Sequence, residues 1–303
     1  MCIRDRLTSV TIGANVSAIG DYAFYDCSYL ASVNFAVGMQ ENGLTIGNYA
    51  FGRCGRLTSI SLPEGTTSLG EGAFYSSALR TIHIPSTVTY MGENSGTGSY
   101  SFDVFSACSE LTAVEVAEDN TAYADIDGIL YVKSVIDPTA ETPEYYISAL
   151  AFCPRRNSGA DGVVDIPSTV RAIWDGAFEM NNGVKQIIFG GGEGLEPIMK
   201  PGTEEGTEEV AVEVSLSVGS GVFRNCVTLE SVVFPEGLTT IQTQMFFGCD
   251  ALREVFIPNT VTSIQSSAFS GCPLLSDIRF GEGGTDPLAI GEEDDVSGAF
   301  ASC

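Results

Sequence analysis

The sequence of 303 residues contains a single histidine and only 14 lysines and arginines, against 39 aspartates and glutamates, for a net charge of −25. A nucleic-acid surface needs clusters of basic side chains that neutralise phosphates, so no nucleic-acid partner is expected. One histidine leaves little room for histidine-based catalysis or metal binding. The chain also lacks GxGxxG and P-loop strings, which gives nucleotide binding no support.

Long apolar runs are missing as well. No stretch reaches the roughly 18 apolar residues that a membrane-spanning helix needs, so no membrane insertion is expected within this segment. Hydrophobic residues make up 44% of the chain and charged residues 17%, which is too apolar for a disordered acidic protein. A folded chain of this length would ordinarily contain about two globular domains.

What the sequence does contain is a repeat of about 23 residues. The string LTSVTIGANVSAIGDYAFYDCSY begins at Leu7 and returns in recognisable form from Leu57, Leu229 and Leu252. Each unit reads Leu-x-x-Ile-x-Ile-Pro, then Val-x-x-Ile, then Ala-Phe-x-x-Cys. We count ten units, which start near residues 7, 30, 57, 79, 111, 161, 184, 229, 252 and 275.

The repeat predicts stacked β coils. In the unit from Leu252, Val255 and Ile257 lie on one side of a strand, and Pro258 ends the hydrogen-bond ladder. The second apolar segment makes the return leg of the coil. One coil cannot bury its own inward side chains, but stacked coils form a continuous core. We therefore predict a mainly β solenoid of about ten 23-residue coils, with a parallel sheet along one face and short turns or single helical turns elsewhere.

Phenylalanine and cysteine recur at fixed positions of the repeat. We interpret the phenylalanines as a stacked spine that fills the core, rather than as an aromatic binding stripe. The spine positions are Phe24, Phe51, Phe74, Phe105, Phe178, Phe223, Phe246, Phe269 and Phe300. Seven of the nine cysteines lie three residues after such a phenylalanine, namely Cys27, Cys54, Cys108, Cys226, Cys249, Cys272 and Cys303.

The cysteine pattern favours a ladder of buried thiols. Two units carry Ser77 and Asn181 at the cysteine position, and these residues can hydrogen-bond but cannot cross-link. We expect the position to need a small side chain beside a loop carbonyl of the next coil. Thiols stacked in register could also approach closely enough for disulfides. No metal and no cofactor are expected, and Cys2 and Cys153 fall outside the pattern.

The repeat resembles the BspA-like leucine-rich repeat family over nearly the whole chain. The string VEVAEDNTAYADIDGILYVKS, from Val114 to Ser134, resembles the Asp-Asn-x-x-Tyr and Asp-Gly-x-Leu-Tyr variant coil that interrupts arrays of this family. The resemblance implies a curved leucine-rich-repeat solenoid with a parallel sheet along one face. It also implies a cell-surface or secreted protein of a host-associated bacterium, with no catalytic residues to carry over.

We expect a single solenoid domain over residues 7–303, preceded by a non-repeat leader at residues 1–6. The domain contains an irregular variant coil at about 111–160 and an acidic insertion at about 190–214. Neither end carries a capping repeat, and the segment contains no recognisable signal or anchor. We therefore expect a fragment of a longer protein, truncated at both ends.

The outward positions of the first strands provide candidate binding residues. They are small and polar in the first half of the chain, whereas units seven to nine place Ile188, Val233 and Phe256 side by side. An exposed apolar row is typical of a binding surface. Glu254 and Arg279 flank the row and complete the candidate set. The alternative is that the acidic insertion folds over the row.

Acidic residues concentrate in that insertion and in Glu292, Glu293, Asp294 and Asp295. The carboxylate order of an EF-hand is missing, and the string DIDG at residues 125–128 is only part of that motif. We interpret the acidic runs as solvated loops, with calcium binding as the alternative. His83, at an exposed strand position, has no catalytic partner at a recognisable spacing.

The function expected from these observations is a non-enzymatic protein-binding or adhesion solenoid of a bacterial cell-surface or secreted protein. Its expected partners are host or neighbouring-cell proteins or glycans, and the chain is expected to be monomeric. One alternative is a structural spacer or display stalk in a larger surface protein. A carbohydrate-active enzyme of the parallel β-helix type is a weaker alternative, because no coil face gathers two carboxylates with a base.

Overall fold

The computed structural model describes residues 6–38, 43–92, 104–137, 140–196, 199–200, 210–211, 215–281, 289–290 and 298–300. The chain is mainly β and winds into about ten turns with parallel sheets, which confirms the predicted fold class. It divides into two compact units. The first comprises Met1–Leu130 and Phe152–Asn157, and the second comprises Tyr131–Ala151 and Ser158–Cys303.

In the first unit, strands of consecutive coils pair in parallel. β1 (Ser9–Ile12) pairs with β3 (Ser32–Phe35), and β6 (Thr81–Ile84) pairs with β8 (Ala113–Val116). In the coil that starts at Leu57, the first segment makes an isolated bridge from Ser61 to His83 in place of a strand. The return legs form a four-stranded parallel sheet of β2 (Ala18–Ile19), β4 (Leu44–Ile46), β5 (Thr66–Leu69) and β7 (Tyr90–Met91).

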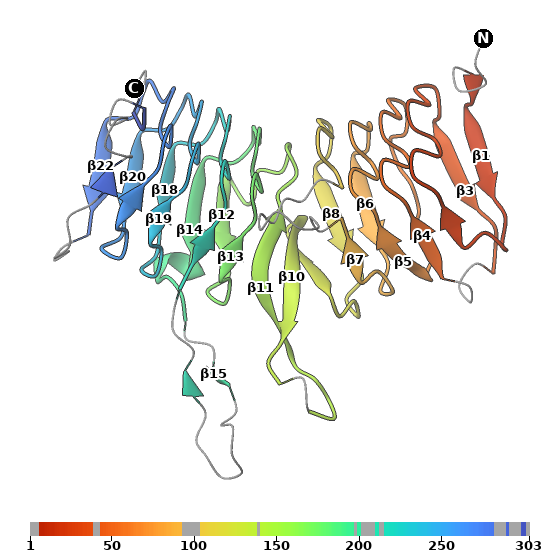
Figure 1. Cartoon of the computed structure of the whole chain (residues 1–303), viewed down its shortest axis with the longest axis horizontal. Coiled ribbons are helices and arrows are strands. Elements are labelled where there is room, and N and C mark those ends of the chain that lie inside the picture. Colours follow the sequence, from red (N-terminus) through yellow and green to blue (C-terminus); the bar gives the residue numbers. More distant parts are fainter. Residues whose placement is uncertain are drawn as a thin grey trace. The chain divides into compact units, whose positions relative to one another are not determined.

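In the second unit, five first-segment strands lie side by side in chain order (Figure 1). They are β12 (Val163–Ile166), β14 (Gln186–Phe189), β18 (Ser231–Val233), β20 (Glu254–Ile257) and β22 (Asp277–Phe280), all parallel. The register sets equivalent repeat positions opposite one another, such as Val233 opposite Phe256. Equivalent side chains therefore form rows across the sheet.

The return legs of the second unit are strands too. β13 (Ala172–Ile173) pairs with β17 (Ser217–Val218), and β19 (Thr240–Ile241), β21 (Ser263–Ile264) and β23 (Ala289–Ile290) form a parallel sheet. The sequence predicted a parallel sheet along one face, with short turns or single helical turns elsewhere. The structure has parallel strands on both legs, because the short apolar return segments also meet in register from coil to coil.

Two segments depart from the regular coil. The variant coil contains β9 (Tyr123–Ile126), β10 (Ile129–Val135) and β11 (Tyr145–Phe152), with β10 and β11 as neighbours. The acidic insertion begins with the 3-10 helix η3 (Gly190–Gly192) and includes the antiparallel pair of β15 (Met199–Lys200) and β16 (Val210–Ala211).

The phenylalanine positions form a stack of rings inside each unit. In the first unit the ring centroids are 5.2 Å apart for Phe24 and Phe51, 5.7 Å for Phe51 and Phe74, and 5.9 Å for Phe74 and Phe105. In the second unit the distances are 5.3 Å for Phe178 and Phe223, 5.3 Å for Phe223 and Phe246, 5.1 Å for Phe246 and Phe269, and 5.2 Å for Phe269 and Phe300. The spacing follows the distance between neighbouring strands of a sheet, so each coil adds one ring.

Candidate functional site

The cysteine thiols link consecutive coils by hydrogen bonds. Five of them donate to the main-chain carbonyl oxygen of a spine phenylalanine: Cys54 to Phe24 at 3.3 Å, Cys108 to Phe74 at 3.0 Å, Cys226 to Phe178 at 2.9 Å, Cys249 to Phe223 at 3.0 Å and Cys272 to Phe246 at 3.0 Å. These acceptors lie in the preceding coil, not in the next coil as predicted, because each phenylalanine carbonyl faces the coil that follows it. All seven cysteines of the described residues are buried thiols, and Cys2 and Cys303 lie outside those residues.

The two described units without cysteine use the same position differently. The hydroxyl of Ser77 lies 3.3 Å from the thiol of Cys108, so it belongs to the same ladder. Asn181 is buried, and its side-chain oxygen accepts hydrogen bonds from the N–H groups of Gly183 (2.9 Å) and Val184 (2.8 Å). The amide of Asn181 therefore closes the turn that leads into β14.

We expect three of the ladder thiols, those of Cys54, Cys108 and Cys226, to be unreactive in the folded protein. Burial raises the pKa of Cys54 to about 12, and burial also raises the pKa of Cys108 and of Cys226. Because the thiolate is the nucleophile, iodoacetamide at pH 8 should alkylate these residues only as the chain unfolds. Peptide mapping by mass spectrometry, with and without 8 M urea, measures this for each cysteine. Rapid labelling of Cys54 or Cys226 in the native protein would contradict the expectation.

The raised thiol pKa values also give stability a definite pH dependence. The contribution of Cys54 to stability is present in full below the unfolded pKa of about 9 and is lost progressively as the pH rises towards about 12. Urea unfolding should therefore give a lower free energy of unfolding at pH 10 than at pH 8. Cys54→Ser should show a smaller decrease over the same interval, because serine does not ionise there.

The variant coil uses its unusual residues for its own structure. Asn120 is buried and makes four hydrogen bonds with main-chain groups. In the string DIDG, a carboxylate oxygen of Asp125 accepts a hydrogen bond from the N–H of Val116 at 2.7 Å. Gly128 has a φ of 76°, and a Cβ there would lie 2.5 Å from the Cβ of Ala113. The close approach requires glycine at this position.

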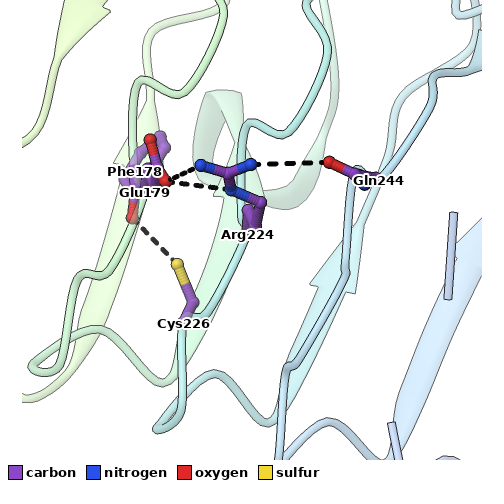
Figure 2. A network of polar contacts seen from close by, with 5 residues as sticks. All are labelled: Phe178, Glu179, Arg224, Cys226 and Gln244. Carbon is purple, nitrogen blue, oxygen red and sulfur yellow. Dashed lines mark hydrogen bonds and ion pairs between the residues drawn. The ribbon is translucent and has the colours of Figure 1, made fainter. Parts of the chain in front are cut away.

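A polar network occupies the corner of the coils in the second unit, next to the phenylalanine spine (Figure 2). The guanidinium of Arg224 donates to the carboxylate of Glu179, with Nε at 2.9 Å, and Nη1 lies 3.5 Å from the side-chain oxygen of Gln244. Below it, the thiol of Cys226 donates to Phe178 (Figure 2). The network therefore spans three consecutive coils.

In the first unit, the corner positions hold tyrosines that the sequence analysis did not single out. The rings of Tyr22 and Tyr49 stack at 5.3 Å, and Tyr25 meets Tyr22 edge-on at 5.4 Å. Tyr75 continues the cluster at 5.8 Å from Tyr49. Tyr22 is 55% exposed, so the cluster forms an aromatic patch on the surface. An alignment of the first three repeats would have revealed it, because these tyrosines fall at only two repeat positions.

Two of these tyrosines occupy a backbone conformation that disfavours them. Tyr22 and Tyr49 have φ values of 56° and 53°. The equivalent position is glycine in three other coils (Gly72, Gly176 and Gly221), and Gln244 and Ser267 in two more, all with positive φ. A left-handed conformation costs a residue with a side chain about 1–2 kcal/mol. Ring stacking within the cluster offsets part of this cost.

The predicted apolar row is half-exposed. Val233 is 39% exposed, and Ile188 and Phe256 are partly buried. The predicted flanking residues Glu254 and Arg279 form an exposed ion pair at 3.3 Å, and Arg279 also pairs with Asp277 at 2.7 Å. The structure thus places the candidate residues on neighbouring strands of one sheet, β14, β18, β20 and β22.

A hollow of about 260 Å³ lies at the end of this row. Its walls are apolar and come from Phe189, Leu195, Val233, Phe234, Pro235 and Phe256. Two exposed carboxylates, Glu193 and Glu236, also line it. The sequence did not reveal Glu193 as part of this site, because its position depends on the path of the insertion after Phe189.

The first residues of the insertion are anchored to the preceding coil. The N–H of Gly191 donates to both carboxylate oxygens of Asp165, at 2.9 and 3.0 Å, and the N–H of Glu196 donates to Ser168 at 3.1 Å. The guanidinium of Arg171 donates to the carbonyl oxygen of Glu196. Residues 190–196 therefore form one wall of the hollow and leave Val233 exposed. Residues 201–209 and 291–297, with most of the acidic runs, lie outside the described residues.

Neither metal ligands nor a membrane span emerges from the described structure. Among the residues described, no three His, Cys, Asp or Glu side chains come together in a way that could hold a metal ion. Within the same ranges, no helix is long and apolar enough to cross a membrane.

The family model for the BspA type leucine rich repeat region matches six copies in this chain, over residues 3–121 and 213–286. The chain belongs to this family. No curated protein matches this BspA-type chain significantly in sequence. The family match includes the predicted variant coil up to residue 121, and it resumes after the acidic insertion.

Solved structures support the same assignment of the fold. A leucine rich cell surface protein from Faecalibacterium prausnitzii A2-165 is 25% identical, with a TM-score of 0.50 over 92% of this chain and 80% of that chain. The pneumococcal vaccine antigen PcpA is 20% identical, with a TM-score of 0.62 over 95% and 66%. A leucine-rich repeat protein from Eubacterium ventriosum ATCC 27560 is 21% identical, with a TM-score of 0.60 over 99% and 83%. The last two similarities show the fold alone.

Proposed function

We propose that this chain is a non-enzymatic binding repeat of a bacterial cell-surface or secreted protein, and that it contacts a partner protein through the row of Ile188, Val233 and Phe256. The hollow at the end of the row carries the proposal, because its largely apolar lining includes the exposed side chain of Val233 and the partly exposed ring of Phe256. Concave, preformed surfaces of this kind concentrate binding energy in a few side chains. The similarity to a cell-surface protein supports the proposed location.

The test compares the wild-type chain with a Val233→Ser/Phe256→Ser variant on immobilised host matrix proteins and glycans. We expect the variant to lose about 2 kcal/mol or more of binding free energy for any partner that uses the row. Biolayer interferometry measures the affinities, and circular dichroism confirms that the variant is folded. Val37→Ser is the control, because Val37 is 99% exposed and belongs to the first unit, whereas the row belongs to the second.

Two outcomes would count against the proposal. If wild type and variant bind every partner equally, the row is not the contact surface. If the wild-type chain binds nothing on the panel, the chain behaves as a structural spacer in a larger surface protein, which was the alternative from the sequence.

A further inference from the structure

We propose that the hollow beside β18 receives an arginine side chain of the partner protein, an inference that rests on the proposed function and names the chemistry of the contact. The size of the hollow is the first argument. Pockets for drug-sized ligands have volumes of about 300–1,000 Å³, and this one, at about 260 Å³, is smaller. A single long side chain fits such a space better than a free metabolite does.

The walls and the carboxylates select the type of side chain. The apolar surfaces of Leu195, Val233 and Phe256 can hold an aliphatic stem. A wholly apolar side chain would remove water from the carboxylates of Glu193 and Glu236 without offering them a partner, and unpaired charges are costly to desolvate. A cationic head group on an aliphatic stem satisfies both parts of the hollow.

Arginine suits the site better than lysine. Its planar guanidinium can donate to a carboxylate in a fork and can stack on an aromatic face, and the partly exposed ring of Phe256 lines the hollow. Among the described residues that line the hollow, none is a lysine or an arginine that could pair with the two carboxylates. The net charge of −25 also favours a basic partner over an acidic one.

The carboxylate of Glu236 and the main chain of Glu193 are held in place before the partner arrives. A carboxylate oxygen of Glu236 accepts a hydrogen bond from the N–H of Asn259 at 3.3 Å. The N–H of Glu193 donates to Gly190 at 3.1 Å, within the loop that Asp165 and Arg171 anchor. Gly194 packs closely against Pro235: a Cβ on this glycine would lie 3.4 Å from the Cβ of Pro235. Such a preformed wall lowers the entropic cost of binding.

Blocked peptides test this directly. The probes are Ac-Gly-Leu-Arg-Leu-Gly-NH₂ and the same peptide with citrulline in place of arginine, which keeps the shape and removes the charge. Chemical-shift titration by NMR should show the arginine peptide binding at least about tenfold more tightly. The Glu193→Gln/Glu236→Gln variant should bring the two peptides to equal affinity. Raising the salt concentration should weaken the binding of the arginine peptide to the wild-type chain and leave the other peptide–protein affinities unchanged.

A matched control uses Glu115→Gln/Glu118→Gln, which removes the same charge from exposed positions of the first unit and should leave the preference for arginine unchanged. Equal affinities for the two peptides, with both lost in Phe256→Ser, would overturn the arginine assignment and leave the proposed binding row intact. No detectable binding of the arginine peptide would also overturn it. The proposed function itself is judged by the separate panel of matrix proteins and glycans, so the two failures are distinguishable.

Discussion

Replacing Asn120 with alanine should lower the free energy of unfolding by about 4 kcal/mol, because it removes four hydrogen bonds to main-chain groups from a largely buried position. The side-chain nitrogen of Asn120 donates to the carbonyl oxygens of Pro85 and Val88, both at 2.9 Å. The side-chain oxygen accepts from the N–H groups of Ala122 and Tyr123, both at 2.8 Å. Asn120 is 1% exposed, so water cannot replace these bonds without opening the coil.

An Asn120→Asp variant separates hydrogen bonding from size. The carboxylate has the same shape but no N–H to donate, and it would face the carbonyl oxygens of Pro85 and Val88. Burial should raise the pKa of the new carboxyl above its unfolded value of about 4. The variant should therefore be most stable at low pH and lose stability as the pH rises through the folded pKa.

Urea unfolding followed by circular dichroism at pH 4.5 and pH 7.5 measures both effects. Asn34→Ala is the control, since Asn34 is exposed on β3 and its replacement should change stability by less than about 0.5 kcal/mol. If the free energy of unfolding of Asn120→Ala lies within about 1 kcal/mol of the wild-type value, the buried amide is not the main source of stability in the variant coil.

The variant coil shows what sequence pattern can and cannot provide. Asp119, Asn120 and Tyr123 stand out in the string because they interrupt the regular repeat, and the resemblance assigned them to a variant coil. Nothing in the string shows that the hydroxyl of Tyr123 would accept a hydrogen bond from the N–H of Met91 at 3.0 Å. That contact joins residues 32 positions apart and depends on how coils stack.

The cysteine ladder and the hollow also combine features that the sequence predicts with features that depend on the three-dimensional structure. The recurrence of Phe-x-x-Cys, with Ser77 and Asn181 as substitutes, was enough to predict a small hydrogen-bonding side chain. Which coil supplies the carbonyl acceptor could not be predicted, because it depends on the three-dimensional path of the turn. For the hollow, Val233 and Phe256 were predictable from strand alternation, whereas Glu193 was not, because an irregular loop has no periodicity to extrapolate.

Phe246→Ala is expected to be the most destabilising change in the spine of the second unit, at about 3–5 kcal/mol. The ring of Phe246 is fully buried and stacks on Phe223 at 5.3 Å and on Phe269 at 5.1 Å. Phe234 also meets it edge-on at 6.1 Å. Truncation removes all three ring contacts and leaves a cavity in the core of that coil.

The position of the cavity should also change how the chain unfolds. Each coil of a repeat protein contacts chiefly its neighbours, so a weak coil divides the array and lowers cooperativity. We expect Phe246→Ala to give a shallower urea transition as well as a lower midpoint. Phe280→Ala provides the control, because Phe280 is 52% exposed on β22 and should lose much less stability than Phe246→Ala. Equal destabilisation by the two variants would mean that ring stacking along the spine is not the main source of stability in this unit.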